Sequence, residues 1–218
     1  MGIVKGVIAG IAPRTPVIDL CHDLPPFAVQ GASWALRSAA PFFPAGTVFV
    51  AIVDPGVGGD RRILLARTVR HLFLAPDNGL LGFLRDARFR AVTNRRLFLA
   101  PVSHTFHGRD VFAPVAARLA RGMAPARVGP RVLSIVRLQE KPGRVAWIDR
   151  FGNLVTNLEP GPRAIRIRGR RVPVVKTYAS STPGALVAVV GSAGTLEISV
   201  VQGSAARRLR AKIGDPVR

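Results

Sequence analysis

A turn in the first half of the sequence places a carboxylate and a guanidinium where they could act together. Asp54-Pro55-Gly56-Val57-Gly58 follows an apolar segment and leads into Arg61-Arg62. In open α/β sheets, ligands bind beyond the carboxyl ends of strands. A carboxylate there can form a bidentate pair with a guanidinium a few residues later. The pattern therefore indicates an Asp54–Arg61 pair, and an ordinary Asp-Pro-Gly turn beside a surface arginine is the alternative.

Two further turns of the first half carry polar side chains. Pro76-Asp77-Asn78-Gly79 has residues that favour a tight turn, and Asp77 could cap a following helix, so we interpret it as structural. In Thr105-Phe-His-Gly-Arg-Asp110, His107 stands just before a predicted helix, whose free N–H groups suit an anion. A neutral histidine there can accept a proton or position a water. The alternative is a solvated histidine beside an aspartate cap.

The second half contains one dense polar turn, Asp149-Arg-Phe-Gly-Asn153. An asparagine amide offers one donor and one acceptor, which matches the edge of adenine. Phe151 could stack on a ligand or fill the core, and Gly152 lets the backbone approach a ligand closely. A later turn, 191–197, ends on Glu197, one of three glutamates in the chain. The sequence contains neither a P-loop nor a Gly-x-Ser-x-Gly nucleophile motif.

The elements that must position these turns alternate in the first part of the chain as they do in an α/β domain. Patterning predicts helices over 28–40 and 110–121, and strands over 16–20, 47–53, 62–67 and 71–75. From about residue 131 the pattern becomes seven short β-like segments separated by Gly or Pro, which favours a small barrel or sandwich. They are 132–138, 144–149, 154–157, 164–168, 172–176, 185–190 and 195–201. We therefore predict two domains, 1–130 and 131–218.

The composition suits a globular protein. The 218 residues are 48% hydrophobic and 20% charged, enough for a core in one or two domains. No apolar run reaches about 18 residues, which excludes a transmembrane helix, and the N-terminus does not resemble a signal peptide. We therefore expect a cytoplasmic protein. Because Cys21 is the one cysteine, an intrachain disulfide or a multi-cysteine metal site is excluded, and we expect no metal.

The formal net charge of +20 has two interpretations. It could serve an anionic partner such as nucleic acid, or it could reflect a general bias toward arginine, which accounts for 28 of the 32 basic residues. We favour the bias because the arginines are scattered. The densest cluster, Arg163–Arg171, alternates with isoleucines like an amphipathic strand and lacks the interleaved aromatics of a single-strand-binding surface. We therefore do not expect a nucleic-acid partner.

Taken in order, four motifs resemble a known enzyme family. They are Asp-Pro-Gly-Val-Gly (54–58), Pro-Asp-Asn-Gly (76–79), Thr-Phe-His-Gly-Arg-Asp (105–110) and Asp-Arg-Phe-Gly-Asn-Leu (149–154). Each is weak alone, but together they resemble the S-adenosyl-L-methionine (SAM) hydrolase (adenosine-forming) family. This family is also called SAM hydroxide adenosyltransferase and is related to fluorinase and chlorinase. The resemblance runs from Met1 nearly to the C-terminus.

The resemblance implies hydrolysis of SAM to adenosine and L-methionine without a cofactor. It also implies an N-terminal α/β sandwich-like domain, a small C-terminal β-barrel domain, and a homotrimer with the active site at the subunit interface. The catalytic roles fall on Asp54, Arg61 and His107. Asn153 would contact adenine and Asp149 the methionine amine. The other substrate-binding positions that the resemblance implies are Phe151, Ser192, Glu197, Val200 and Phe27, where the halogenases have a tryptophan.

The start of the chain departs from the family. Members begin with a strand ending in Thr-Asp-Phe-Gly, whose Asp holds the ribose hydroxyls, whereas Met1–Ile8 resembles the helix that follows. We expect the missing strand to leave a neighbouring strand edge unpaired, and we hypothesise that Met1 is an internal codon of a longer reading frame. The alternatives to a SAM hydrolase are a catalytically impaired SAM or adenosine binder and a basic nucleic-acid-binding protein. A halogenase would have a tyrosine in place of Asp54 and lack the His107-Gly108 pair.

Overall fold

The structure is a computed structural model that describes residues 1–139 and 141–218. The chain forms two compact units, Met1–Leu138 and Gln139–Arg218. The first unit has helices and a mixed sheet, and the second is largely β-structure. The predicted mixed α/β fold with two parts is thereby confirmed. No described helix is both long enough and apolar enough to traverse a bilayer.

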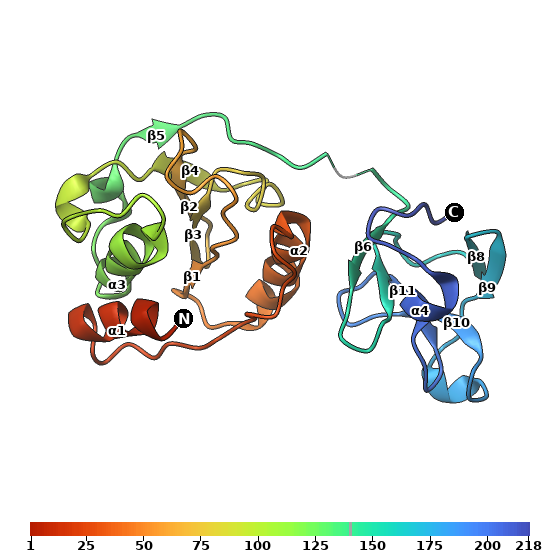
Figure 1. The fold of residues 1–218 in the computed structure, drawn as a ribbon. Coiled ribbons are helices and arrows are strands. Elements are labelled where there is room, and N and C mark those ends of the chain that lie inside the picture. Colours follow the sequence, from red (N-terminus) through yellow and green to blue (C-terminus); the bar gives the residue numbers. More distant parts are fainter. Residues whose placement is uncertain (140) are drawn as a thin grey trace. The chain divides into compact units, whose positions relative to one another are not determined.

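A five-stranded sheet forms the centre of the first unit (Figure 1). Its order is β1 (Val48–Val50), β3 (Leu72–Pro76), β2 (Ile63–Arg67), β4 (Arg88–Ala91) and β5 (Arg131–Val132). β1 runs parallel to β3, and the other neighbours are antiparallel. Because β5 pairs with β4, the chain belongs to this sheet beyond residue 130.

Helices cover both faces of this sheet because β2 is apolar on both sides. Leu64 and Ala66 pack in the cluster that contains α2 (Val29–Ala39). Ile63 and Leu65 point the opposite way, as alternate residues of a strand must, into the cluster built on α3 (Ala113–Ala120). α1 (Gly2–Ile11) packs on α3. Short helical turns complete the unit: η1 (Ala40–Phe42), η2 (Arg95–Leu97), η4 (Pro125–Val128) and a π-helical turn, η3 (Gly108–Phe112).

The strand predicted over 16–20 is absent, and the one predicted over 47–53 is reduced to β1. Both outcomes have one cause, since a strand needs a partner to take up its backbone hydrogen bonds. β1 pairs only with β3 among the described strands and forms one edge of the sheet. A cavity of about 520 Å³ lies here, lined by the 15–22 segment and by 43–53. Val17, Ile18 and Leu20 are left 42%, 69% and 43% exposed.

The second unit contains an open four-stranded antiparallel sheet and a separate hairpin. The sheet order is β10 (Leu186–Val190), β11 (Leu196–Val200), β7 (Leu154–Thr156) and β6 (Val145–Ile148). β8 (Ala164–Ile167) and β9 (Arg170–Pro173) form the hairpin, and η5 (Tyr178–Ser180) and α4 (Ala205–Leu209) are short helices. Six of the seven predicted strands are found here, whereas the strand predicted over 132–138 is wrong, since only Val132 of it lies in a strand, β5 of the first unit. The described strands do not close, so the predicted barrel is not confirmed.

Candidate active site

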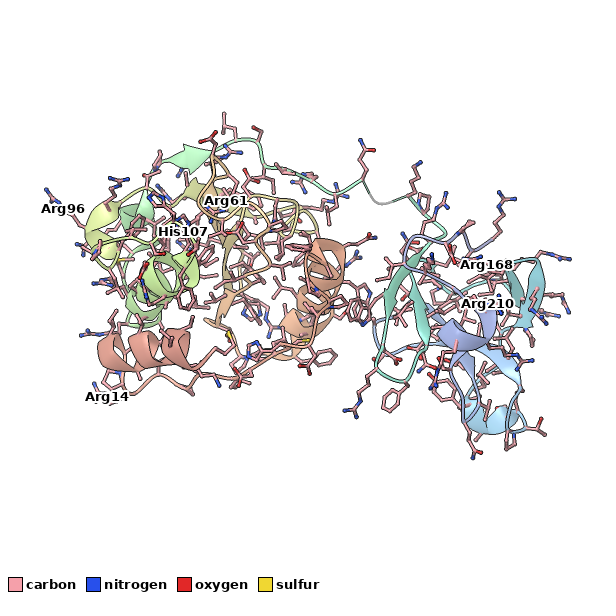
Figure 2. The ribbon with its side chains drawn as sticks, viewed as in Figure 1. Arg14, Arg61, Arg96, His107, Arg168 and Arg210 are labelled. Carbon is pink, nitrogen blue, oxygen red and sulfur yellow. The ribbon has the colours of Figure 1, made fainter. Side chains whose placement is uncertain are left out.

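In the first unit, Arg61 contacts both Asp54 and His107, and Figure 2 labels Arg61 and His107 close to each other. Arg61 Nε donates to both carboxylate oxygens of Asp54 at 2.9 Å, and Nη2 donates to Oδ2 as well. Arg61 Nη2 lies 2.9 Å from Nδ1 of His107. The Asp54 and Arg61 side chains are only 5% and 12% exposed. Two loops, the one between β1 and β2 and the one that enters η3, thus bring together the predicted catalytic residues.

The contact with Arg61 fixes the protonation of His107. A guanidinium has no acceptor atom, so Nδ1 of His107 must accept this hydrogen bond, and the proton of the neutral ring is on Nε2. Burial lowers the pKa of His107, and the positive charge of Arg61 lowers it further. His107 is therefore a neutral imidazole at neutral pH, with an N–H available at Nε2.

A glycine lets two of these loops approach one another. Gly58 has φ of +79°, and a Cβ on it would lie 2.2 Å from the carbonyl oxygen of His104. Asp110 anchors the second loop, since it accepts the Ser103 N–H at 2.8 Å and is paired with Arg109. The hydrogen bond from Arg109 lowers the pKa of Asp110. These contacts assign Asp110 to the structure of the loop.

A second arginine–aspartate pair stands beside the first and is structural. Arg62 Nε donates to Asp77 Oδ2 at 2.8 Å, and Asp77 Oδ1 accepts the Val136 N–H at 2.8 Å. Asn78 Nδ2 donates to the carbonyl oxygen of Val53 at 2.8 Å, which holds the residue just before Asp54. The Pro76–Gly79 turn is thus a structural support for the loop that carries Asp54.

The cluster has one free set of donors. Arg61 uses Nε and Nη2 on Asp54 and His107, while its Nη1 makes no hydrogen bond within the described structure. An arginine held in this way can direct Nη1 at an oxygen that gains negative charge. The neutral histidine beside it can take up a proton at Nδ1 only by giving up the hydrogen bond from Arg61. Among the described residues, no three His, Cys, Asp or Glu side chains are grouped to hold a metal ion.

In the second unit, the predicted substrate residues Asp149 and Asn153 bond to each other. Asp149 Oδ1 accepts the N–H groups of Phe151 and Asn153 at 2.9 and 2.8 Å, and Oδ2 accepts Asn153 Nδ2 at 2.9 Å. Gly152, with φ of +83°, lies where a Cβ would be 2.0 Å from Ser204 Oγ. The turn is therefore seated on the start of α4. Phe151 is 61% exposed, so it does not fill the core.

The register of the sheet places Glu197 on the same face as this turn. Glu197 is opposite Val155 and Ile198 is opposite Leu154, and extending this register sets Ser199 beside Asn153. Asp149 N–H bonds the Asn153 carbonyl, which places Asp149 on the next strand of that face. The polar residues Asp149, Asn153, Ser199 and Glu197 thus share one face of the sheet.

Tyr178 joins this face and was missed in the sequence. Its hydroxyl donates to Glu197 Oε1 at 2.5 Å, and Ser199 Oγ donates to the same oxygen at 3.4 Å. Burial and the bond to Glu197 raise the pKa of Tyr178 to about 12. Tyr178 is the one tyrosine of the chain, and that rarity was the available signal. Ser199 could have been found from the alternation Glu197-Ile198-Ser199.

The other predicted substrate residues are more scattered. Ser192 is exposed in the turn between β10 and β11. Val200, 9% exposed, packs in the core of the second unit, on the side of the sheet opposite Glu197. Phe27, in the first unit, is 74% exposed with φ of +65°. Ser192 makes no side-chain hydrogen bond in the described structure, and the roles of Ser192 and Phe27 stay predictions.

Comparison with known proteins agrees with the motifs. Models of the N- and C-terminal domains of SAM hydroxide adenosyltransferase match residues 1–129 and 143–218. The (R)-S-adenosyl-L-methionine hydrolase of Thermus thermophilus is 42% identical over 100% of this chain and 93% of its own length. A solved structure of a conserved protein from Thermotoga maritima superposes with a TM-score of 0.92, at 38% identity, over 99% and 93% of the two chains.

A fluorinase of Nocardia brasiliensis is more distant, at 26% identity over 71% of this chain and 65% of its own length. This chain is therefore more similar in sequence to the hydrolases than to this fluorinase, which agrees with the presence of Asp54 and of the His107-Gly108 pair. Both family models together cover nearly the whole sequence. The chain belongs to the SAM hydroxide adenosyltransferase family.

Proposed function

We propose that this protein hydrolyses S-adenosyl-L-methionine to adenosine and L-methionine. The observation that carries the proposal is the contact of Asp54, Arg61 and His107 in a member of this family. Relatives of 30–42% identity over 98–100% of the chain bear the name of this hydrolase, which supports the same reaction.

The reaction is a displacement at C5′ of the ribose. The oxygen of water forms a bond to C5′ while the bond from C5′ to sulfur breaks, and the electron pair leaves with sulfur. Methionine departs as a neutral thioether, so the leaving group needs no proton. One proton of the water must be lost. A water held in line gains most from positioning, which is worth about 7–11 kcal/mol in the best intramolecular reactions.

The cluster is suited to the water. Asp54 holds Arg61 through Nε and Nη2, which leaves Nη1 to donate to the attacking oxygen as the charge on it rises. Burial and Arg61 keep His107 neutral. Its Nε2 already carries a proton, so it takes the released proton at Nδ1, and in doing so it gives up the hydrogen bond from Arg61. Neither step requires a metal or a cofactor, and we propose that the enzyme uses none.

We further propose that Asn153 contacts the adenine and Asp149 the methionine amine, with Phe151, Ser192, Glu197 and Phe27 completing the substrate site. The Val200 side chain packs in the core on the other side of the sheet, so we do not assign it a side-chain contact with the substrate. Asp149 already orients Asn153 through two hydrogen bonds and holds the Phe151 N–H through a third, which supports a preformed recognition turn. As in the family, the protein would be a homotrimer with its active site at the subunit interface. Light scattering of the purified protein tests the trimer.

The activity is tested by incubating purified protein separately with the (R) and (S) sulfonium epimers of SAM and following adenosine and methionine by chromatography. We expect both products in equal amounts from the (R) epimer, which the names of the relatives specify. His107→Ala should abolish turnover and leave the fold intact. SAM that binds but stays unchanged would reject hydrolysis and favour the impaired binder.

A further inference from the structure

We propose that the outer face of the β8–β9 hairpin binds the phosphate backbone of a double-stranded nucleic acid. The face is built from Arg171, Arg166 and Arg218, hereafter the arginine row. This site lies in the second unit and is independent of the hydrolytic reaction. It departs from the expectation drawn from the scattered arginines of the sequence, because backbone pairing aligns three of them. It arises from the way that three neighbouring chain segments align their side chains.

Backbone pairing sets the three arginines side by side. Arg166 is directly opposite Arg171 in the β8–β9 register. On its other side, Arg166 N–H donates to the Arg218 carbonyl at 2.6 Å and the Arg218 N–H donates back at 3.0 Å. The N–H and C=O of one strand residue point to the same side, so Arg166 and Arg171 form the non-hydrogen-bonded type of pair. Cα spacings of about 5.5 and 4.5 Å follow, and the row spans about 10 Å.

The opposite side of the hairpin fixes the direction of the row. Ile165, Ile167, Val172 and Val217 alternate with the arginines, are at most 2% exposed and belong to the core of the second unit. Since successive side chains of a strand point to opposite faces, the arginines must point to solvent, and all three are exposed. At the hairpin turn, Arg168 is instead paired with Asp215 at 2.8 Å (Figure 2).

No acidic side chain is paired with the row among the described residues, although Arg218, the last residue of the sequence, also carries an α-carboxylate there. Arg166, Arg171 and Arg218 form no side-chain hydrogen bond or ion pair with any residue that the structure describes. Like charges directly opposite one another in a sheet are destabilising, and about 10 Å is close to the screening length at physiological salt. The second unit has 14 basic and five acidic residues, so the surrounding charge adds to this repulsion. An anionic ligand would relieve it.

The chemistry of the row favours a duplex backbone. Guanidinium forks bind phosphate oxygens in a bidentate manner, and a duplex carries one negative charge per about 1.7 Å of its axis. Single-stranded nucleic acids are held largely by stacking on aromatic side chains, and no aromatic residue lies within residues 163–173. The arginine row would therefore contact the phosphates of the duplex, and its affinity would not depend on the base sequence.

The test measures the anisotropy of a short labelled DNA duplex between about 50 and 200 mM salt. Arg166→Glu removes one contact and also pairs with Arg171, so the slope of log affinity against log salt should fall by about 1.8. Arg171→Gln should lower it by about 0.9. The matched control is Arg96→Glu in η2 of the first unit, which makes the same change in net charge at another exposed arginine (Figure 2).

Stability separates this effect from misfolding. Because Arg166→Glu replaces a like-charge pair by an ion pair, its Tm should rise, by up to about 4 °C, while its binding weakens. The proposal is overturned if the wild-type protein shows no salt-dependent binding, if Arg96→Glu weakens binding as much as Arg166→Glu, or if Arg166→Glu lowers the Tm. A labelled single strand that binds as tightly as the duplex would also overturn it.

Discussion

Asp54→Asn tests whether Asp54 serves catalysis by orienting Arg61, apart from any contribution of Asp54 to the stability of the fold. Asp54 accepts Nε and Nη2 of Arg61 and is 5% exposed. Asparagine keeps one acceptor but turns an NH₂ group toward the guanidinium, so one charge-assisted hydrogen bond is lost, worth about 1.5–3 kcal/mol. Arg61 would then be free to shift, and a misplacement of about 1 Å can cost about 10²-fold in rate. We expect kcat to fall about 10²-fold with KM little changed.

The neighbouring pair supplies the control. In Asp77→Asn the same substitution breaks the Arg62 pair, in which Nε and Nη2 also donate, both to Oδ2, and no histidine is in contact. The Arg62 side chain is 43% exposed, but that of Asp77 is 3% exposed and also accepts the Val136 N–H, so the loss should cost stability by about 1.5–3 kcal/mol, as in Asp54→Asn. Adenosine formation gives kcat and KM, and thermal unfolding gives the stability. Equal losses of kcat in the two variants, or none in Asp54→Asn, would refute the role of Asp54.

Three further predictions follow from single contacts. Below about pH 6.5 the free energy of unfolding should decrease as the pH falls, because burial lowers the pKa of both His71 and His107 and the unfolded chain therefore binds protons first. His71 packs against Phe49, so His71→Phe should weaken this pH dependence. Urea titrations at several pH values measure it. Gly58→Ala should cost about 1–3 kcal/mol and lower activity, because its φ is positive and the His104 carbonyl blocks a Cβ; an unchanged Tm and rate would contradict this. Tyr178→Phe should raise KM for SAM severalfold with little change in kcat, because it removes the hydroxyl that holds Glu197; steady-state kinetics decide, and an unchanged KM would exclude Tyr178 from the substrate site.

The sequence pattern predicted those features that depend on neighbouring residues in the chain. The turns carrying Asp54 and His107 were predicted because Asp-Pro-Gly and a residue before a helix have recognisable sequences, and the strands of the second unit were predicted from Gly and Pro spacing. The strand predicted over 16–20 was wrong because periodicity records which faces are apolar and not whether a partner strand is present. Closure of a barrel depends on register between distant strands in the same way. Tyr178 was missed because its partner, Glu197, is reached only through the fold.

The consecutive residues Arg61 and Arg62 show what the register adds to the sequence. By type and spacing either could have been the partner of Asp54. The Arg62 carbonyl accepts the Asp77 N–H at 2.9 Å, so the ladder between β2 and β3 extends back to residue 62 and the alternation of β2 applies to both arginines. Arg62 then shares the face of Leu64, whereas Arg61 shares the face of Ile63 and Leu65, which pack against the η3–α3 segment that begins beside His107. A shift of one residue in β2 would exchange the two arginines and bring Arg62 toward His107. The identity of the candidate catalytic arginine therefore depends on the apolar alternation of β2 as much as on the loop that carries Asp54.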